Sequence, residues 1–203
     1  PMAGGKAKGR CRPPASQEGL RALTAGEENE SRKMAKEIER KFLVNKEILI
    51  PLLTSGSYER RVLRQYYLHS EKNVAVRLRQ DGDDVILAIK AGGDGMTTNE
   101  FEFTVDPSSY VERSDERVGI EINKTRHLVP HAGRIFEVDV YADELEGLIV
   151  AELECPDTAT VTDLPEWIGD EVTYDSRYKN AVLAVKGMPS PDMASEGIYS
   201  GRR

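Results

Sequence analysis

Charged side chains recur at every second position in one strand-like segment of this chain after another. Because residues two apart in a β-strand point to the same face, each segment presents a charged face and an opposite, apolar face. Val76 and Leu78 form the apolar face of one segment, and Phe101 and Phe103 form that of another. The charged positions are Glu37, Glu39 and Lys41; Arg77 and Arg79; Lys90; Glu100 and Glu102; Lys124 and Arg126; Glu137 and Asp139; and Glu152 and Glu154. The pattern predicts a sheet with one charged and one apolar face.

Short turn-like segments separate these strands, so we expect a mainly antiparallel sheet. The predicted strands are 36–44, 61–70, 73–79, 84–91, 99–105, 121–129, 134–141 and 148–155. The predicted helices are short: one capped by Asn45 and ending near 53, one from Asp106-Pro107 to about 117, one at 163–167, and one capped by Ser176 and running through 185. About eight strands with a few helices give an α+β class with a large sheet or a barrel.

Two arrangements fit such a sheet. An open sheet would leave its charged face in water and cover its apolar face with helices, which is a common arrangement. Surface strands usually mix in Thr, Ser and Gln, however, whereas here nearly every strand carries a charged pair. If the sheet closes, an eight-stranded barrel is just wide enough inside for side chains or one small ligand. Because unpaired buried ions are costly, a charged interior would have to hold water, metal and a polyanion.

Composition limits the size and the partners of the fold. With 203 residues, 39% of them apolar, the chain can form one substantial domain, which we place at 34–188 between a disordered tail at 1–33 and a loose tail at 189–203. A net charge of −7 provides no general attraction for nucleic acid, so any polyanion must be bound locally. Two cysteines favour a reducing, cytoplasmic setting, and no run of about 18 apolar residues predicts a membrane span.

The stretch Glu37-Ile38-Glu39-Arg40-Lys41-Phe42 would place two carboxylates and one ammonium group in a row, about 7 Å apart. Such a set could hold a divalent cation and a phosphate, although a solvated strand face with mixed charges has the same pattern. Together with seven later motifs, the stretch resembles the ExExK signature of the CYTH superfamily, the triphosphate tunnel metalloenzymes. The later motifs are Val76-Arg77-Leu78-Arg79, Ala88-Ile89-Lys90, Asn99-Glu100-Phe101-Glu102, Lys124-Thr125-Arg126, Glu137-Val138-Asp139-Val140, Ala151-Glu152-Leu153-Glu154 and the run from Val172 to Asn180.

The resemblance implies a closed eight-stranded antiparallel barrel, a tunnel with a charged interior and peripheral helices, that binds triphosphate with Mg²⁺ or Mn²⁺. The positions that match the family's phosphate-binding residues are Lys41, Arg77, Arg79, Lys90, Lys124 and Arg126. The metal candidates are Glu37, Glu39, Glu137, Asp139, Glu152 and Glu154, and the first choices are Glu37, Glu39 and Glu152 or Glu154. Glu100 and Glu102 could equally orient the arginines. Tyr67, Arg177, Tyr178 and Lys179 resemble the part that closes one tunnel end and contacts substrate, although a packing role fits them as well.

Lys124 and Glu39 are the catalytic candidates. A lysine among other cations can have a lowered pKa, so Lys124 could deprotonate or position the attacking water. The chain most resembles the small bacterial-type members of the family, and we expect metal-dependent hydrolysis of inorganic tripolyphosphate to pyrophosphate and phosphate. A class IV adenylate cyclase, a thiamine triphosphatase and a non-catalytic polyphosphate or nucleotide sensor remain alternatives. We expect a monomer or homodimer with neither a nucleic-acid nor a membrane partner.

Overall fold

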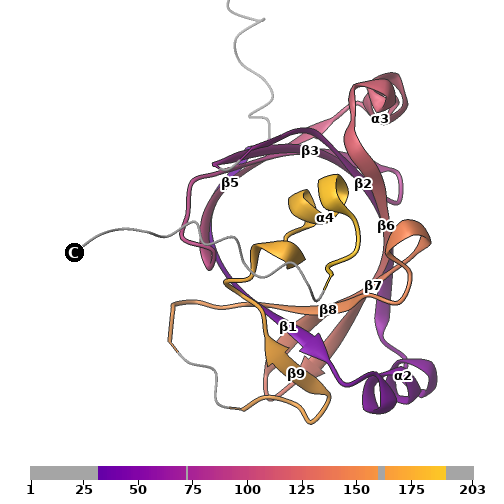
Figure 1. Ribbon diagram of the computed structural model, residues 1–203, viewed down its shortest axis with the longest axis vertical. Coiled ribbons are helices and arrows are strands. Elements are labelled where there is room, and N and C mark those ends of the chain that lie inside the picture. Colours follow the sequence, from indigo (N-terminus) through magenta and orange to yellow (C-terminus); the bar gives the residue numbers. More distant parts are fainter. Residues whose placement is uncertain (1–31, 72, 160–162, 191–203) are drawn as a thin grey trace, which may run out of the picture. The chain divides into compact units, whose positions relative to one another are not determined.

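The computed structural model describes residues 32–71, 73–159 and 163–190. The strands are β1 (Arg32–Val44), β2 (Glu59–Glu71), β3 (Val74–Asp81), β4 (Asp84–Ala91), β5 (Thr97–Val105), β6 (Val118–His131), β7 (Arg134–Tyr141), β8 (Ile149–Glu154) and β9 (Ile168–Glu171). They form one sheet in the order β5-β4-β3-β2-β6-β7-β8-β1-β9, and β5 also pairs with β1 (Figure 1). Eight antiparallel strands therefore close into a barrel with β9 as an additional strand, which confirms the predicted fold.

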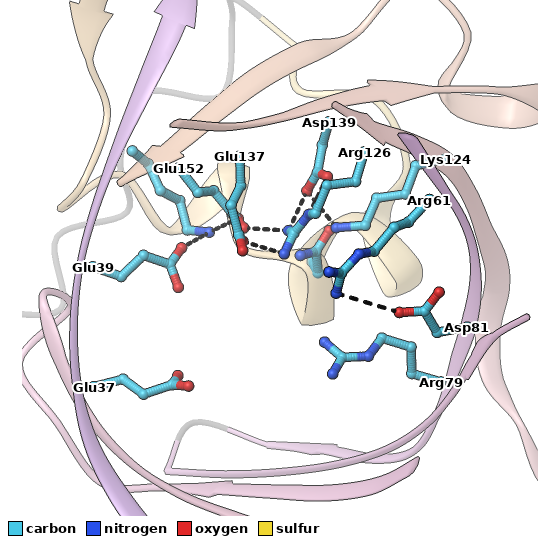
Figure 2. A network of polar contacts seen from close by, with 12 residues as sticks. Glu37, Glu39, Arg61, Arg79, Asp81, Lys124, Arg126, Glu137, Asp139 and Glu152 are labelled. Atoms are coloured by element: carbon cyan, nitrogen blue, oxygen red, sulfur yellow. Dashed lines mark hydrogen bonds and ion pairs between the residues drawn. The ribbon is translucent and has the colours of Figure 1, made fainter. Parts of the chain in front are cut away.

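Closure depends on the length of β1. Its first part pairs with β5, up to Ile38 opposite Thr97, and its second part pairs with β8, from Glu39 opposite Glu154 to Leu43 opposite Val150. The charged residues of the ExExK-like stretch thus lie at the point where β1 stops pairing with β5 and begins to pair with β8. The closed sheet turns its charged face inward, so that carboxylates from β1, β7 and β8 face one interior (Figure 2).

The apolar faces of the strands lie on the outside of the barrel, beneath short helices. Helix α2 (Lys46–Ser55) begins at its predicted cap, where the side chain of Asn45 accepts a hydrogen bond from the Glu47 amide at 3.1 Å. On this side the core contains Phe42, Leu49, Phe136, Val138 and Trp167. On another side, Tyr110 of helix α3 (Ser108–Glu112) packs with Tyr66, Leu78 and Val85. Burial on the outside leaves the interior free for charge.

The last helix plugs one end of the barrel (Figure 1). Leu183 and Ala184 of α4 (Asn180–Lys186) are buried against the inward-facing Tyr67, Ile122 and Tyr141. The strand β6 begins so close to this helix that a Cβ atom on Gly119 would lie 2.0 Å from the Ala184 carbonyl oxygen. Gly119 also has a φ of +75°, which side chains other than glycine rarely adopt. The plug therefore needs a glycine at this position.

Three predicted helices differ from the structure. The helix predicted at 163–167 is wrong: 163–165 are irregular, a turn follows, and β9 then pairs with β1 at Phe42 and Val44, so that tertiary pairing overrides the local signal. The helix predicted from Asp106 to 117 is shorter and gives way to the 3-10 helix η1 (Ser114–Glu116). The last helix is not capped by Ser176: Asp175 caps the 3-10 helix η3 (Ser176–Tyr178), and α4 begins only after the extended Lys179, which stands at its N-cap position without a side-chain cap hydrogen bond. A further 3-10 helix, η2 (Asp143–Leu145), connects β7 to β8.

The chain ends fall largely outside the described residues, as do most of the tails predicted at 1–33 and 189–203. Strand β1 begins at Arg32, two residues before the predicted start of the domain. In the ranges that the structure describes, no helix combines the length and the apolar character that crossing a membrane requires.

Candidate functional site

Arg126 organises the ion pairs on one side of the barrel interior (Figure 2). Its Nε lies 2.7 Å from Asp139 Oδ1, and its Nη2 lies 2.7 Å from both Asp139 Oδ2 and Glu152 Oε2. Its Nη1 also pairs with Glu137. Asp139 is fully buried and Glu152 is 6% exposed. One guanidinium therefore holds three carboxylates from two strands, β7 and β8.

Lys41 links this group to the ExExK-like stretch. Its Nζ lies 2.5 Å from Glu39 Oε1 and also pairs with Glu152, which is opposite Lys41 in the register of β1 and β8. Burial opposes the charge of this ammonium group, but Glu152 and Glu39 outweigh it and raise the pKa of Lys41. Burial likewise opposes the charge of Glu152, but Lys41 and Arg126 hold its pKa well below the usual range. Both groups are therefore charged at neutral pH.

A second set of ion pairs lies on β1, β3, β4 and β5. Arg77 contacts Glu100 at 3.2 Å, and Arg79 contacts Glu102 at 3.1 Å. Lys90 lies 2.8 Å from Glu37 and 3.2 Å from Glu100. The two acids that could orient the arginines thus do contact them. Burial and a hydrogen bond to Glu37 raise the pKa of Glu100 to about 7.

Lys124 is the most deeply buried cation of the interior, at 3% exposure, and pairs with the fully buried Asp139. Burial, together with the nearby charge of Arg126, lowers the pKa of Lys124 to about 8, although Asp139 acts in the opposite direction. Its Nζ also lies 5.5 Å from the centre of the Tyr141 ring. A lysine that exchanges its proton near neutral pH can serve as a general base.

Most of the barrel-forming part of the chain matches a known family. Residues 35–184 match the CYTH domain. This chain belongs to the CYTH domain family. An inorganic triphosphatase of Acetivibrio thermocellus is 36% identical over 153 residues, which cover 74% of this chain and 94% of that protein. An inorganic triphosphatase of Nitrosomonas europaea is 36% identical over 154 residues, covering 73% and 97%. The crystal structure of the inorganic triphosphatase NE1496 aligns with a TM-score of 0.54 and 32% identity, covering 74% of this chain and 95% of that one.

The remaining predicted site residues of this CYTH domain have different surroundings. Tyr67 is buried against the plug helix. Lys179 is half-buried, and burial together with the nearby Lys41 lowers its pKa. Arg177 instead contacts Asp175, at 2.6 Å between Nη2 and Oδ2, and the Ser190 carbonyl oxygen at 3.0 Å. Glu154 is exposed, opposite Glu39 in the register.

Two inward-facing residues of β2 were missed by the sequence reasoning. Arg61 lies opposite Arg126 in the register and 3.9 Å from Asp81, and it points into the barrel (Figure 2). Gln65 is fully buried and lies opposite Arg79. The sequence did contain a signal for them: both residues are an even number of positions from Tyr67, so on a β-strand they lie on the same face as Tyr67. Within the predicted strand 61–70 only Arg61 of the two is charged; its charged partner on the same face, Glu59, lies in β2 but before the predicted start of the strand.

Proposed function

We propose that this protein hydrolyses inorganic tripolyphosphate to pyrophosphate and phosphate, with Mg²⁺ or Mn²⁺ bound by interior carboxylates. The observation that carries the proposal is the closed barrel whose interior gathers six cations from four strands, β1, β3, β4 and β6: Lys41, Arg77, Arg79, Lys90, Lys124 and Arg126. Tripolyphosphate carries about four to five negative charges, and arginine forks and lysine point charges suit that load. The curated relatives named inorganic triphosphatase support the same substrate.

The interior has unused capacity to donate hydrogen bonds to an anion. The Nε atoms of Arg77 and Arg79 are buried without a hydrogen-bond partner among the described residues. Burial and the neighbouring Arg77 also lower the pKa of Arg79, so the surrounding carboxylates do not fully compensate its charge. Because buried donors are rarely left unpaired, this side of the barrel favours a guest rich in acceptor oxygens.

The carboxylates fit a divalent metal by their chemistry and by their convergence. Glu39 and Glu152 both contact the Lys41 ammonium group, so these two carboxylates already converge on one positive charge. Oxygen-only donors suit Mg²⁺ and Mn²⁺, which would polarise phosphate oxygens and water when bound. Within the described ranges, no three acidic, histidine or cysteine side chains are gathered as a metal site. Glu37 or Glu154, waters and phosphate oxygens would therefore complete the ligand set.

Lys124 would take the proton of the attacking water. Its Nζ is buried beside Asp139, and its lowered pKa of about 8 keeps a fraction of the amine neutral at physiological pH. Arg126, which binds the same aspartate, would hold the phosphate chain and orient it. Lys124 and Arg126 are neighbours on one face of β6, so Arg126 could bind the phosphate chain while Lys124 accepts the proton.

The test is phosphate release from tripolyphosphate, ATP and thiamine triphosphate, each with Mg²⁺, Mn²⁺ or EDTA. We expect metal-dependent release from tripolyphosphate that Glu39→Gln abolishes. Glu116→Gln is the matched control, because Glu116 forms an exposed ion pair with Arg113 away from the tunnel. Preference for thiamine triphosphate, or formation of cyclic AMP from ATP, would assign another activity. Tight binding without turnover would indicate a sensor.

A further inference from the structure

Gln65 is an unusual residue in this interior, because it is neutral, fully buried and unpaired. Neither its amide nitrogen nor its amide oxygen has a hydrogen-bond partner among the described residues, and its exposure is 0%. A buried amide without partners destabilises a fold, and native structures rarely keep one without a reason. The charged residues around it are nearly all engaged in ion pairs. Gln65 is therefore maintained at a cost to the ligand-free protein.

The register of the barrel places Gln65 beside the phosphate-binding candidates. It lies opposite Arg79 on β3 and opposite Ile122 on β6, and its neighbour on the same face, Leu63, lies opposite Lys124. Residues directly opposite each other in an antiparallel pair have Cβ atoms about 5 Å apart and project from the same face. Because Arg79 points into the barrel, Gln65 does as well (Figure 2).

Arg79 also has an unpaired buried group, and it is a donor that could pair with the amide oxygen of Gln65. Its Nη2 contacts Glu102, but its Nε is buried without a partner. An amide oxygen is an acceptor of the kind that this N–H lacks, and Gln65 carries one on the adjacent strand. An arginine held through Nε keeps its outer nitrogens free to form a fork with a phosphate.

We propose that Gln65 is a positioning residue for the triphosphate: its amide oxygen accepts from Nε of Arg79 when the guanidinium turns from Glu102 to the phosphate chain. The inference rests on the proposed function, since it takes triphosphate as the ligand. It explains why a neutral amide is kept among charges: a carboxylate at this position would compete with the phosphate for Arg79, and an apolar side chain would leave the guanidinium without support.

The first test compares stability with affinity in Gln65→Met, which has a similar volume and no hydrogen-bonding groups. We expect its Tm without ligand to equal or exceed that of the unmodified protein, because an unpaired amide is removed. We expect tripolyphosphate affinity, measured by calorimetry in EDTA, to fall about 10- to 100-fold, the size of one buried hydrogen bond to a charged group. A lower Tm with unchanged affinity would overturn the proposal and indicate a structural role, for example one met by a buried water.

The second test asks whether Gln65 acts through Arg79. In a double-mutant cycle, Gln65→Met should weaken tripolyphosphate binding strongly when Arg79 is present, and hardly at all when Arg79 is already replaced by methionine. Additive effects would overturn the proposal. If the unmodified protein binds tripolyphosphate without hydrolysing it, the proposed function is refuted, but the cycle still decides the role of Gln65. If Gln65→Met leaves both hydrolysis and binding unchanged, only the role of Gln65 is refuted. No binding of tripolyphosphate in the unmodified protein would overturn both.

Discussion

Replacing Arg126 with methionine should destabilise the protein far more than replacing an exposed arginine. Arg126 contacts Asp139, Glu152 and Glu137, and the first two of these are buried. Lys124 would remain beside Asp139, and Lys41 beside Glu152. The negative charges of the two carboxylates would therefore still be compensated in part. Removing one partner of a buried ion pair typically costs about 3–5 kcal/mol. For a protein of this size that corresponds to a fall in Tm of roughly 6–20 °C.

The matched control is Arg113→Met. Arg113 and Glu116 form an exposed pair in which both side chains are 56% exposed, so the expected cost is under about 1 kcal/mol. Arg126→Lys keeps the charge but cannot contact three carboxylates at once, and its stability should be intermediate. Urea unfolding and calorimetry of the three variants provide the comparison. Equal Tm values for Arg126→Met and Arg113→Met would refute the view that the interior network is energetically coupled.

The pH dependence of this effect follows from Glu152. Its pKa is lowered in the folded protein, so the stability it contributes is present above the unfolded value of about 4.5 and is lost as the pH falls through the folded pKa. Without Arg126 the folded pKa of Glu152 should rise, because one of its two main cationic partners is gone. The difference in unfolding free energy between the two proteins should therefore be largest near neutral pH and shrink in acid.

Three further predictions concern the base, the plug and the ligands. If Lys124 accepts a proton, kcat should rise with pH through about 8, and Lys124→Ala should lower kcat more than it raises KM; unchanged turnover in the variant would exclude this role. Gly119→Ala should lower the unfolding free energy by about 1–3 kcal/mol more than Gly133→Ala, since both glycines have φ near +75° but only Gly119 faces Ala184; equal costs would show that the plug is not tightly packed. In calorimetry with Lys124→Ala, Mg²⁺ and tripolyphosphate should each strengthen binding of the other, because the metal would occupy carboxylates that now neutralise the cations; independent binding would contradict this coupling.

Much of the barrel could be predicted because its strands repeat one simple rule. Alternation in segments such as Glu100-Phe101-Glu102 identified both faces correctly. Across β4, the arginines of β3 reach the glutamates of β5 diagonally, Arg77 to Glu100 and Arg79 to Glu102. Alternation could not distinguish an open from a closed sheet, because both satisfy period two. The closure was implied by the family resemblance, and the pairing of β5 with β1 confirms it.

The features that escaped prediction depend on contacts between distant segments. Strand β9 forms because residues 168–171 meet β1, and nothing in its own four residues distinguishes it from a turn. Gln65 resembles an ordinary polar residue of a strand until its surroundings show an amide without partners. The lowered pKa of Lys124 was expected from neighbouring cations, but burial is its main cause, and the depth of a side chain is set by the plug and by strand closure.

The most direct test of the central proposal is ³¹P NMR of tripolyphosphate incubated with the protein and Mg²⁺. We predict that the tripolyphosphate signals are replaced by pyrophosphate and phosphate in equal molar amounts, and that EDTA or Glu39→Gln prevents the change. Tripolyphosphate that stays intact with the unmodified protein and Mg²⁺, or that breaks down equally with Glu39→Gln, would contradict an inorganic triphosphatase acting in this tunnel.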